Sequence, residues 1–140
     1  TTEIYTLSLH DALPIYRTRL RQLQDLLASG QFVRLYMNAH LPSSGDTGEE
    51  YEEVIAPGYG AALMGFEDWT ITEEGATGTE QGFLFLSAPV PKIYGYFLTE
   101  RITNRFLWAD AFARPVEITL PRFELYVTPC LQFARSLVPA

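Results

Sequence analysis

The chain is poor in the residues that most often build metal and redox sites. Its 140 residues include one cysteine, Cys130, and two histidines, His10 and His40. A single cysteine excludes an internal disulfide and a cysteine-rich zinc centre, and one or two imidazoles are too few for the usual zinc ligand set. Cys130 follows Pro129 in a strand-like segment, which is typical of a small buried apolar residue.

Long apolar runs are also missing. No stretch approaches the roughly 20 apolar residues that cross a bilayer, and the start shows no basic segment followed by an apolar leader core. The sequence therefore predicts neither a membrane partner nor a secretory signal.

Positive charge is absent from the middle of the chain. No Lys or Arg lies between Leu35 and Pro91, and the net charge of the whole chain is −7. Ten acidic residues fall in that interval: Asp46, Glu49, Glu50, Glu52, Glu53, Glu67, Asp68, Glu73, Glu74 and Glu80. Because an acidic surface repels phosphate groups and anionic lipid heads, we expect no nucleic-acid or membrane partner. A charge run of this kind is typical of a solvated face.

Residues 1–15 read TTEIYTLSLHDALPI. They resemble the translated read-through of sequencing-adapter DNA that appears at the ends of metagenomic contigs. We therefore expect a non-native tail over residues 1–15, with little packing, and one domain over residues 16–140.

One helix is predicted near the start of that domain. Leu20, Leu23, Leu26 and Leu27 fall on one helical face, and Gly30 suits the position just past a helix end. The helix is expected over about residues 17–29.

From residue 32 onward the pattern predicts short strands separated by turn residues. The expected strands are Phe32–Asn38, Tyr51–Ile55, Tyr59–Met64, Trp69–Thr72, Gly82–Ser87, Ile93–Thr99, Arg105–Ala113, Val116–Leu120 and Phe123–Phe133, with turns at Gly75–Gly78 and Arg101–Asn104. Such spacing is typical of an antiparallel β-sandwich or jelly-roll-like domain. The predicted fold class is mainly β with one N-terminal α-helix.

The strand Ile93–Thr99 is apolar or aromatic on both faces. Alternation places Ile93, Gly95, Phe97 and Thr99 on one face and Tyr94, Tyr96 and Leu98 on the other. This predicts an interior strand or one covered by a partner. Gly95, between two tyrosines, predicts a bulge or a close backbone approach.

The sequence holds no catalytic constellation, and we expect no enzyme, cofactor or metal. Gly58-Tyr59-Gly60 lacks the third glycine of a dinucleotide loop, because Leu63 stands in its place. Two alternatives stay open. Asp46, Glu49 and Glu50 could hold calcium outside an EF-hand. A pair among Glu67, Asp68, Glu73 and Glu74 could hydrolyse glycosides only within a shielded pocket.

The pattern over about residues 32–133 resembles a family of small structural proteins from tailed bacteriophages, whose members are often called tail or tail-fibre proteins. The matching pieces are VRLYMN at Val33–Asn38, IYGYFLTE at Ile93–Glu100, LWADAF at Leu107–Phe112 and VTP at Val127–Pro129. The chain departs from the family at Arg122-Phe123-Glu124, where members often carry Gly-Asp before the last strand.

The resemblance implies a virion component, assembled in the host bacterial cytoplasm, whose partners are other virion proteins and copies of itself. Tyr94, Tyr96, Trp108 and Trp69 are the candidate interface or binding aromatics, because Trp and Tyr dominate contact energies where they are exposed. The alternative function is a carbohydrate- or receptor-binding β-sandwich, which needs a concave aromatic patch that includes Trp69 or Trp108.

Overall fold

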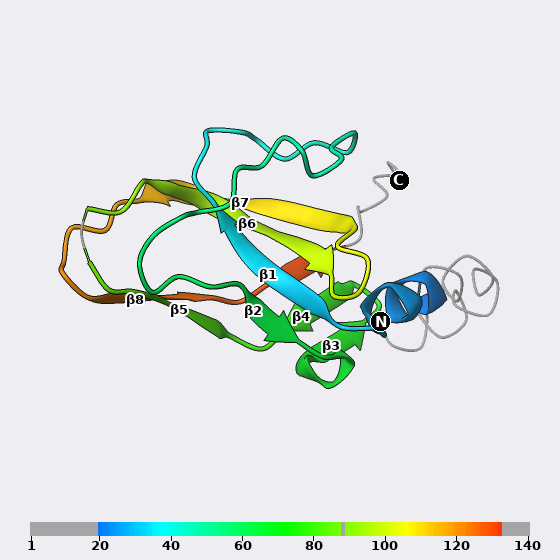
Figure 1. Cartoon of the computed structure of the whole chain (residues 1–140). Helices are drawn as coiled ribbons and strands as arrows, with labels where there is room; N and C mark the ends of the chain where they lie inside the picture. The colour runs from blue at the N-terminus through cyan, green and yellow to red at the C-terminus, as the bar shows by residue number, and fades with distance from the viewer. Residues whose placement is uncertain (1–19, 88, 133–140) are drawn as a thin grey trace.

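The computed structural model describes residues 20–87 and 89–132 (Figure 1). The tail expected over residues 1–15 lies outside the described residues. A helix covers residues 20–27, and a 3-10 turn covers Phe66–Asp68. The strands are β1 (Gln31–Tyr36), β2 (Ala62–Met64), β3 (Trp69–Thr72), β4 (Gly75–Gly78), β5 (Gln81–Phe85), β6 (Ile93–Glu100), β7 (Phe106–Val116), β8 (Phe123–Val127) and β9 (Cys130–Gln132).

The strands form three antiparallel sheets. Their orders are β2-β1-β6-β7, β3-β4-β9 and β5-β8. The four-stranded sheet makes one layer, and the two smaller sheets lie across the core from it (Figure 1). The predicted mainly β, antiparallel class with one helix is confirmed, and the layers are sandwich-like. The jelly-roll order of strands stays a prediction.

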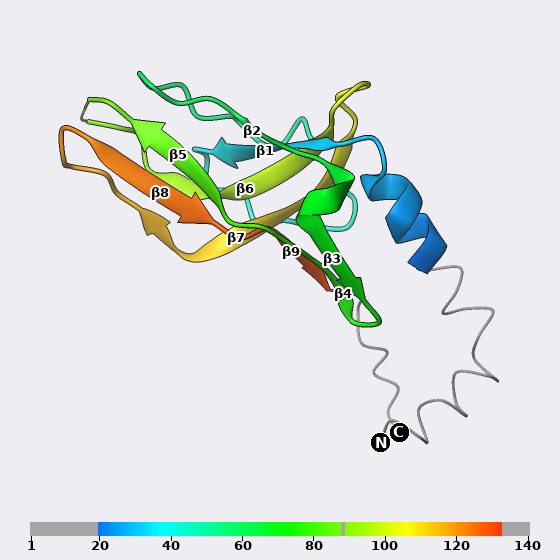
Figure 2. The same cartoon turned by 90° about the horizontal axis from the view of Figure 1, so that it is seen from below.

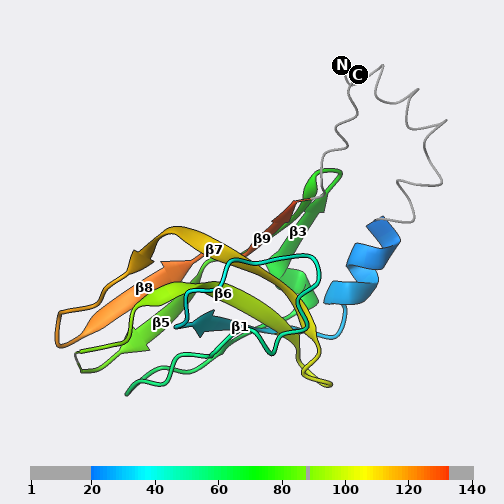
Figure 3. The same cartoon turned by 90° about the horizontal axis from the view of Figure 1, so that it is seen from above.

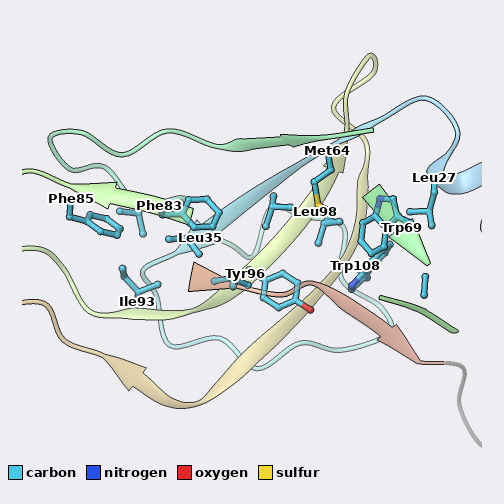
Figure 4. Packing of buried hydrophobic residues seen from close by; sticks show 14 of the residues in the cluster. Leu27, Leu35, Met64, Trp69, Phe83, Phe85, Ile93, Tyr96, Leu98 and Trp108 are labelled. Carbon is cyan, nitrogen blue, oxygen red and sulfur yellow. The ribbon is translucent and has the colours of Figure 1, made fainter. Parts of the chain in front are cut away.

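One apolar core lies between the layers (Figure 4). Leu35, Leu98 and Met64 come from the four-stranded sheet, and Phe83 and Phe85 come from β5. Burial of each such side chain contributes about 1.5–3 kcal/mol, so residues distant in sequence hold the layers together.

The helix lies at one end of the molecule, beside β3 (Figure 2). Its leucine face is confirmed, because Leu23 and Leu27 are buried. Gly30 follows with φ +90°, a left-handed conformation that glycine adopts without the Cβ clash of other residues.

Gln31 joins this helix to the sandwich. Its buried side-chain amide donates to the Leu27 carbonyl at 2.8 Å, and its carbonyl oxygen accepts the Trp69 indole N–H at 2.7 Å. Both ends of a buried polar group are thereby satisfied, as burial requires.

Strand β6 is interior, between β1 and β7, as predicted. Its pairing with β7 shifts register between Ile93 and Gly95, and a Cβ at Gly95 would overlap the Asp110 carbonyl oxygen. The predicted bulge and close approach are confirmed. The predicted grouping of side chains is wrong before the bulge, because the irregularity places Ile93 in the main core with Tyr96, while Tyr94 packs against the cluster that contains Phe97.

The turn predicted at Gly75–Gly78 is wrong. This segment is β4, and the turn lies directly before it, at Glu73 and Glu74. A Cβ at Gly75, where φ is +144°, would overlap the Leu131 carbonyl of β9. The glycine is therefore needed for close strand pairing rather than for chain reversal.

Other boundaries also differ from the expectation; for example, the strand expected over Tyr59–Met64 covers only Ala62–Met64. Tyr51–Ile55 contributes only an isolated bridge between Glu53 and Tyr36. The segment Val116–Leu120 is not a separate strand, because β7 ends at Val116. The expected strand Phe123–Phe133 is divided into β8 and β9 at Thr128 and Pro129, since proline cannot donate to a ladder.

Candidate functional site

The structure buries three of the four candidate aromatics. Trp69 is 8% exposed, Trp108 9% and Tyr96 4%. The two indoles pack edge to face, with ring centres 5.6 Å apart (Figure 4). Tyr94 is half-buried against the cluster that contains Phe97. Neither tryptophan forms an exposed aromatic platform.

Tyr96 ties β6 to β9 across the core. Its hydroxyl accepts the Cys130 N–H at 2.9 Å and donates to the Cys130 carbonyl at 3.2 Å. Burial raises the pKa of Tyr96 to about 12, so the hydroxyl stays neutral and keeps its proton for this bond. Cys130 itself is half-buried, less than the sequence predicts.

A second aromatic cluster lies on the opposite face of the four-stranded sheet. We call it the outer cluster; it comprises Tyr36, Tyr51, Phe97 and Phe106. The Tyr51 ring stacks on Phe97 and on Phe106, with ring centres 5.3 Å apart in each pair, and meets Tyr36 edge to face at 4.9 Å. Tyr51 belongs to the long β1–β2 loop, which this ring fixes over β6 and β7 (Figure 3).

Asp46 is the hub of that loop. Its carboxylate accepts the Tyr51 hydroxyl at 2.5 Å, the Ser43 N–H at 2.9 Å and a bond from His40 Nε2 at 2.9 Å. The Tyr51 bond is the first cause that lowers the pKa of Asp46. Burial, followed by the same bond to Asp46, raises the pKa of Tyr51. Asp46, His40 and Tyr51 thus close the loop with a charge-assisted network.

Arg34 connects the β1–β2 loop to the neighbouring strands. Its guanidinium donates to Thr99 at 2.9 Å, to Glu53 at 3.0 Å and to Asn104 at 3.2 Å. Glu53 also accepts the Tyr59 hydroxyl at 2.7 Å. The guanidinium links β1 to β6, to the β6–β7 turn and to the β1–β2 loop, so it acts as a structural crosslink.

Two of the carboxylates considered for calcium binding or glycoside hydrolysis form hydrogen bonds to nearby backbone N–H groups. Glu50 accepts the backbone N–H groups of Thr47 and Gly48, each at 2.9 Å, and Asp68 accepts the Gly65 N–H at 2.9 Å. Across residues 20–87 and 89–132, no group of three His, Cys, Asp or Glu side chains is arranged to hold a metal ion. Glu67 and Glu74 are exposed, and Glu73 lies in the β3–β4 turn.

A hollow of about 410 Å³ separates β7 from β9. Trp108, Ala109 and Asp110 line one side of it, and Cys130, Leu131 and Gln132 line the other. Figures 2 and 3 both show β9 running beside β7 without joining its sheet. The hollow therefore lies between the edges of two sheets.

The fold places the chain in the mainly β class, as a sandwich-like domain. Comparison with protein-family models, with curated proteins and with solved structures finds no match in any of the three. Within the described part of the chain, no helix is long and apolar enough to cross a membrane.

Sequence reasoning missed the Asp46 network and the Arg34 crosslink. Tyr51 was the available signal, because it is an aromatic residue within the acidic run. If its ring is buried against a sheet, the acidic residues beside it must lie close to that sheet as well. No spacing rule joins His40, Asp46 and Tyr51, because their meeting depends on how the loop folds back.

Proposed function

We propose that this domain is a structural component of a tailed bacteriophage virion, in the tail or head–tail region, and that it acts by protein–protein assembly. The proposal places it in the virion after assembly in the host cytoplasm, with other virion proteins and copies of itself as partners. It rests on the sequence resemblance in Ile93–Glu100 and Leu107–Phe112 together with one surface feature.

That feature is the uncovered face of the β5–β8 sheet. Phe83 and Phe85 point into the core, so alternation turns Leu84 and Leu86 outward. Tyr126, opposite Gly82 in β8, covers the space that the glycine leaves. Tyr126 is 55% exposed and Leu86 46%. Glu124 lies opposite Leu84 on the same face and accepts the Tyr126 hydroxyl. A face that combines exposed leucine and tyrosine side chains with one carboxylate, on a sheet of only two strands, supports a contact with another protein.

The alternative was a carbohydrate- or receptor-binding module with a concave patch at Trp69 or Trp108. Both rings are buried, and the described surface presents neither for stacking on a sugar. We therefore carry forward the assembly role.

Mass spectrometry and electron-microscopic localisation on purified particles of the phage that encodes this chain test the proposal. We expect the protein in intact particles at a stoichiometric copy number. Its absence from purified particles would contradict the assigned role.

A paired substitution tests the contact face. Leu86→Glu with Tyr126→Glu is expected to lower incorporation into particles, because two charges would be buried in the contact. Leu120→Glu, at an apolar residue that is 56% exposed outside β5 and β8, is the matched control and should incorporate normally. Equal incorporation of the double variant and the wild type would exclude this face as the contact.

A further inference from the structure

We infer that the hollow between β7 and β9 is a docking slot for an extended, basic peptide segment of a partner protein. The segment would add to the open edge of β7 and bring a Lys or Arg side chain to Asp110. The inference rests on the proposed assembly role, for which it names the partner's chemistry, and four observations support it.

The first observation is that both walls are strand edges. Strand β7 ends the order β2-β1-β6-β7, and β9 ends the order β3-β4-β9. The Asp110 carbonyl lies against Gly95 and so faces β6. Because amide groups point to alternate sides of a strand, those of Ala109 and Ala111 face the open edge. An unpaired edge of this kind is a template for strand addition.

The second observation concerns Trp108. Its indole N–H is buried and has no hydrogen-bond partner, the one such side-chain group among the described residues. The nitrogen is on the side of the ring that points toward the Tyr96 hydroxyl (Figure 4), and that hydroxyl is already engaged with Cys130. Trp108 also lines the hollow, so a small shift of the ring would let a peptide carbonyl there accept this proton.

The third observation concerns Asp110. It lies directly opposite Tyr96 in the β6–β7 register, on the core side of β7 at the rim of the hollow. The residue is solvent-accessible, yet partial loss of hydration at the carboxyl group raises its pKa. Among the described residues no cation lies within ion-pair distance of it. A cation from a partner would compensate this carboxylate.

The fourth observation selects the occupant. A second copy of the chain has a net charge of −7, so it complements the Asp110 carboxylate less well than a basic segment does. Small anions are repelled by the same carboxylate. An extended basic segment supplies carbonyl groups for Trp108, amide groups for the β7 edge and a cation for Asp110, so one ligand satisfies all three.

The test is a nuclear magnetic resonance titration of the full chain. The probe is an equimolar pool of acetylated, amidated heptapeptides with Arg at the centre and Val or Thr at the other six positions. We expect saturable shifts of the Trp108 indole proton and of the Ala109 and Ala111 amides. A pool with Glu at the centre should cause none.

Two variants make the result specific. Asp110→Asn should weaken binding of the Arg pool about threefold, the loss expected for one solvent-accessible ion pair worth roughly 0.7 kcal/mol. Glu117→Gln removes a charge just beyond β7 without touching the hollow and should bind like the wild type.

Several results would overturn the inference. They are no saturable shift up to millimolar peptide, shifts that Asp110→Asn leaves unchanged, or equal shifts with the Glu pool. A concentration-dependent dimer that perturbs the same Ala109 and Ala111 amides without peptide would assign the slot to a second copy instead. Peptide binding without particle incorporation would contradict the proposed function alone, and incorporation without peptide binding would contradict the slot alone.

Discussion

Single polar residues hold together parts of the chain that apolar burial alone would leave free to slide. Gln31 fixes the helix end against Trp69, and Arg34 fixes the β6–β7 turn against the β1–β2 loop. Hydrogen bonds are directional, so each of these side chains specifies one relative position of its partners.

Asp46 makes the stability of the β1–β2 loop depend on pH in the acidic range. The lowered pKa means that its contribution to stability is present above the unfolded-state value near 3.9 and is lost as pH falls through the folded value. We predict that Asp46→Asn removes part of the stability difference between pH 7 and pH 3, measured by urea unfolding at both values.

The matched control for Asp46→Asn is Glu74→Gln, at an exposed carboxylate in the β3–β4 turn. It should preserve the wild-type difference between the two pH values. An unchanged pH dependence in Asp46→Asn would show that the network does not hold the loop in solution.

At the scale of elements, glycines and prolines fix where strands approach and where they stop. Gly75 and Gly95 lie where a neighbouring carbonyl occupies the space of a Cβ. Pro129 separates β8 from β9, which belong to different sheets. The chain can therefore pass from one sheet to another without a long connection.

Substitution at Gly75 tests the β4–β9 pairing. Gly75→Ala combines a φ of +144° with overlap of the Leu131 carbonyl, and we predict a loss of roughly 2–3 kcal/mol in the free energy of unfolding. The midpoint of urea unfolding measures it.

Gly60→Ala is the control for this substitution, because no atom lies within 4 Å of the Cβ position and φ is not positive. Its effect should stay within about 0.5 kcal/mol. Equal effects at Gly60 and Gly75 would contradict the tight β4–β9 approach.

The sequence predicted where most strands lie but rarely their exact ends. Trp69–Thr72 is predicted to the residue, and the bulge at Gly95 follows from a glycine between two tyrosines. The glycines of Gly75–Gly78 misled the prediction, since glycine serves turns and close strand contacts alike and only the position of β9 distinguishes them.

At the scale of the whole molecule, tyrosines tie the two faces of the main sheet to the rest of the fold. Tyr59 and Tyr96 lie on the core side, and Tyr36 and Tyr51 lie on the outer side. Burial raises the pKa of Tyr36 and of Tyr96 to about 12, and it raises those of Tyr51 and Tyr59 as well.

An alkaline titration reports on this packing. Because these folded-state pKa values exceed the unfolded value near 10, the stability they confer is full below pH 10 and is lost as pH rises through about 12. We predict two phases of phenolate absorbance, the later one coincident with loss of circular dichroism. As a control, all tyrosines of the urea-unfolded protein should titrate near pH 10. A single phase near pH 10 in the folded protein would contradict the burial of these four tyrosines.

The sequence by itself determined the mainly β class, the helix with its leucine face, and the interior position of Ile93–Thr99, because periodicity and turn chemistry are local properties of the chain. Only the tertiary structure decided that Trp69 and Trp108 are buried, that Asp46 meets Tyr51 and His40, and that β7 and β9 face each other across a hollow. These features depend on contacts between segments far apart in sequence, and no local pattern encodes which sheet edge a strand will join or leave open.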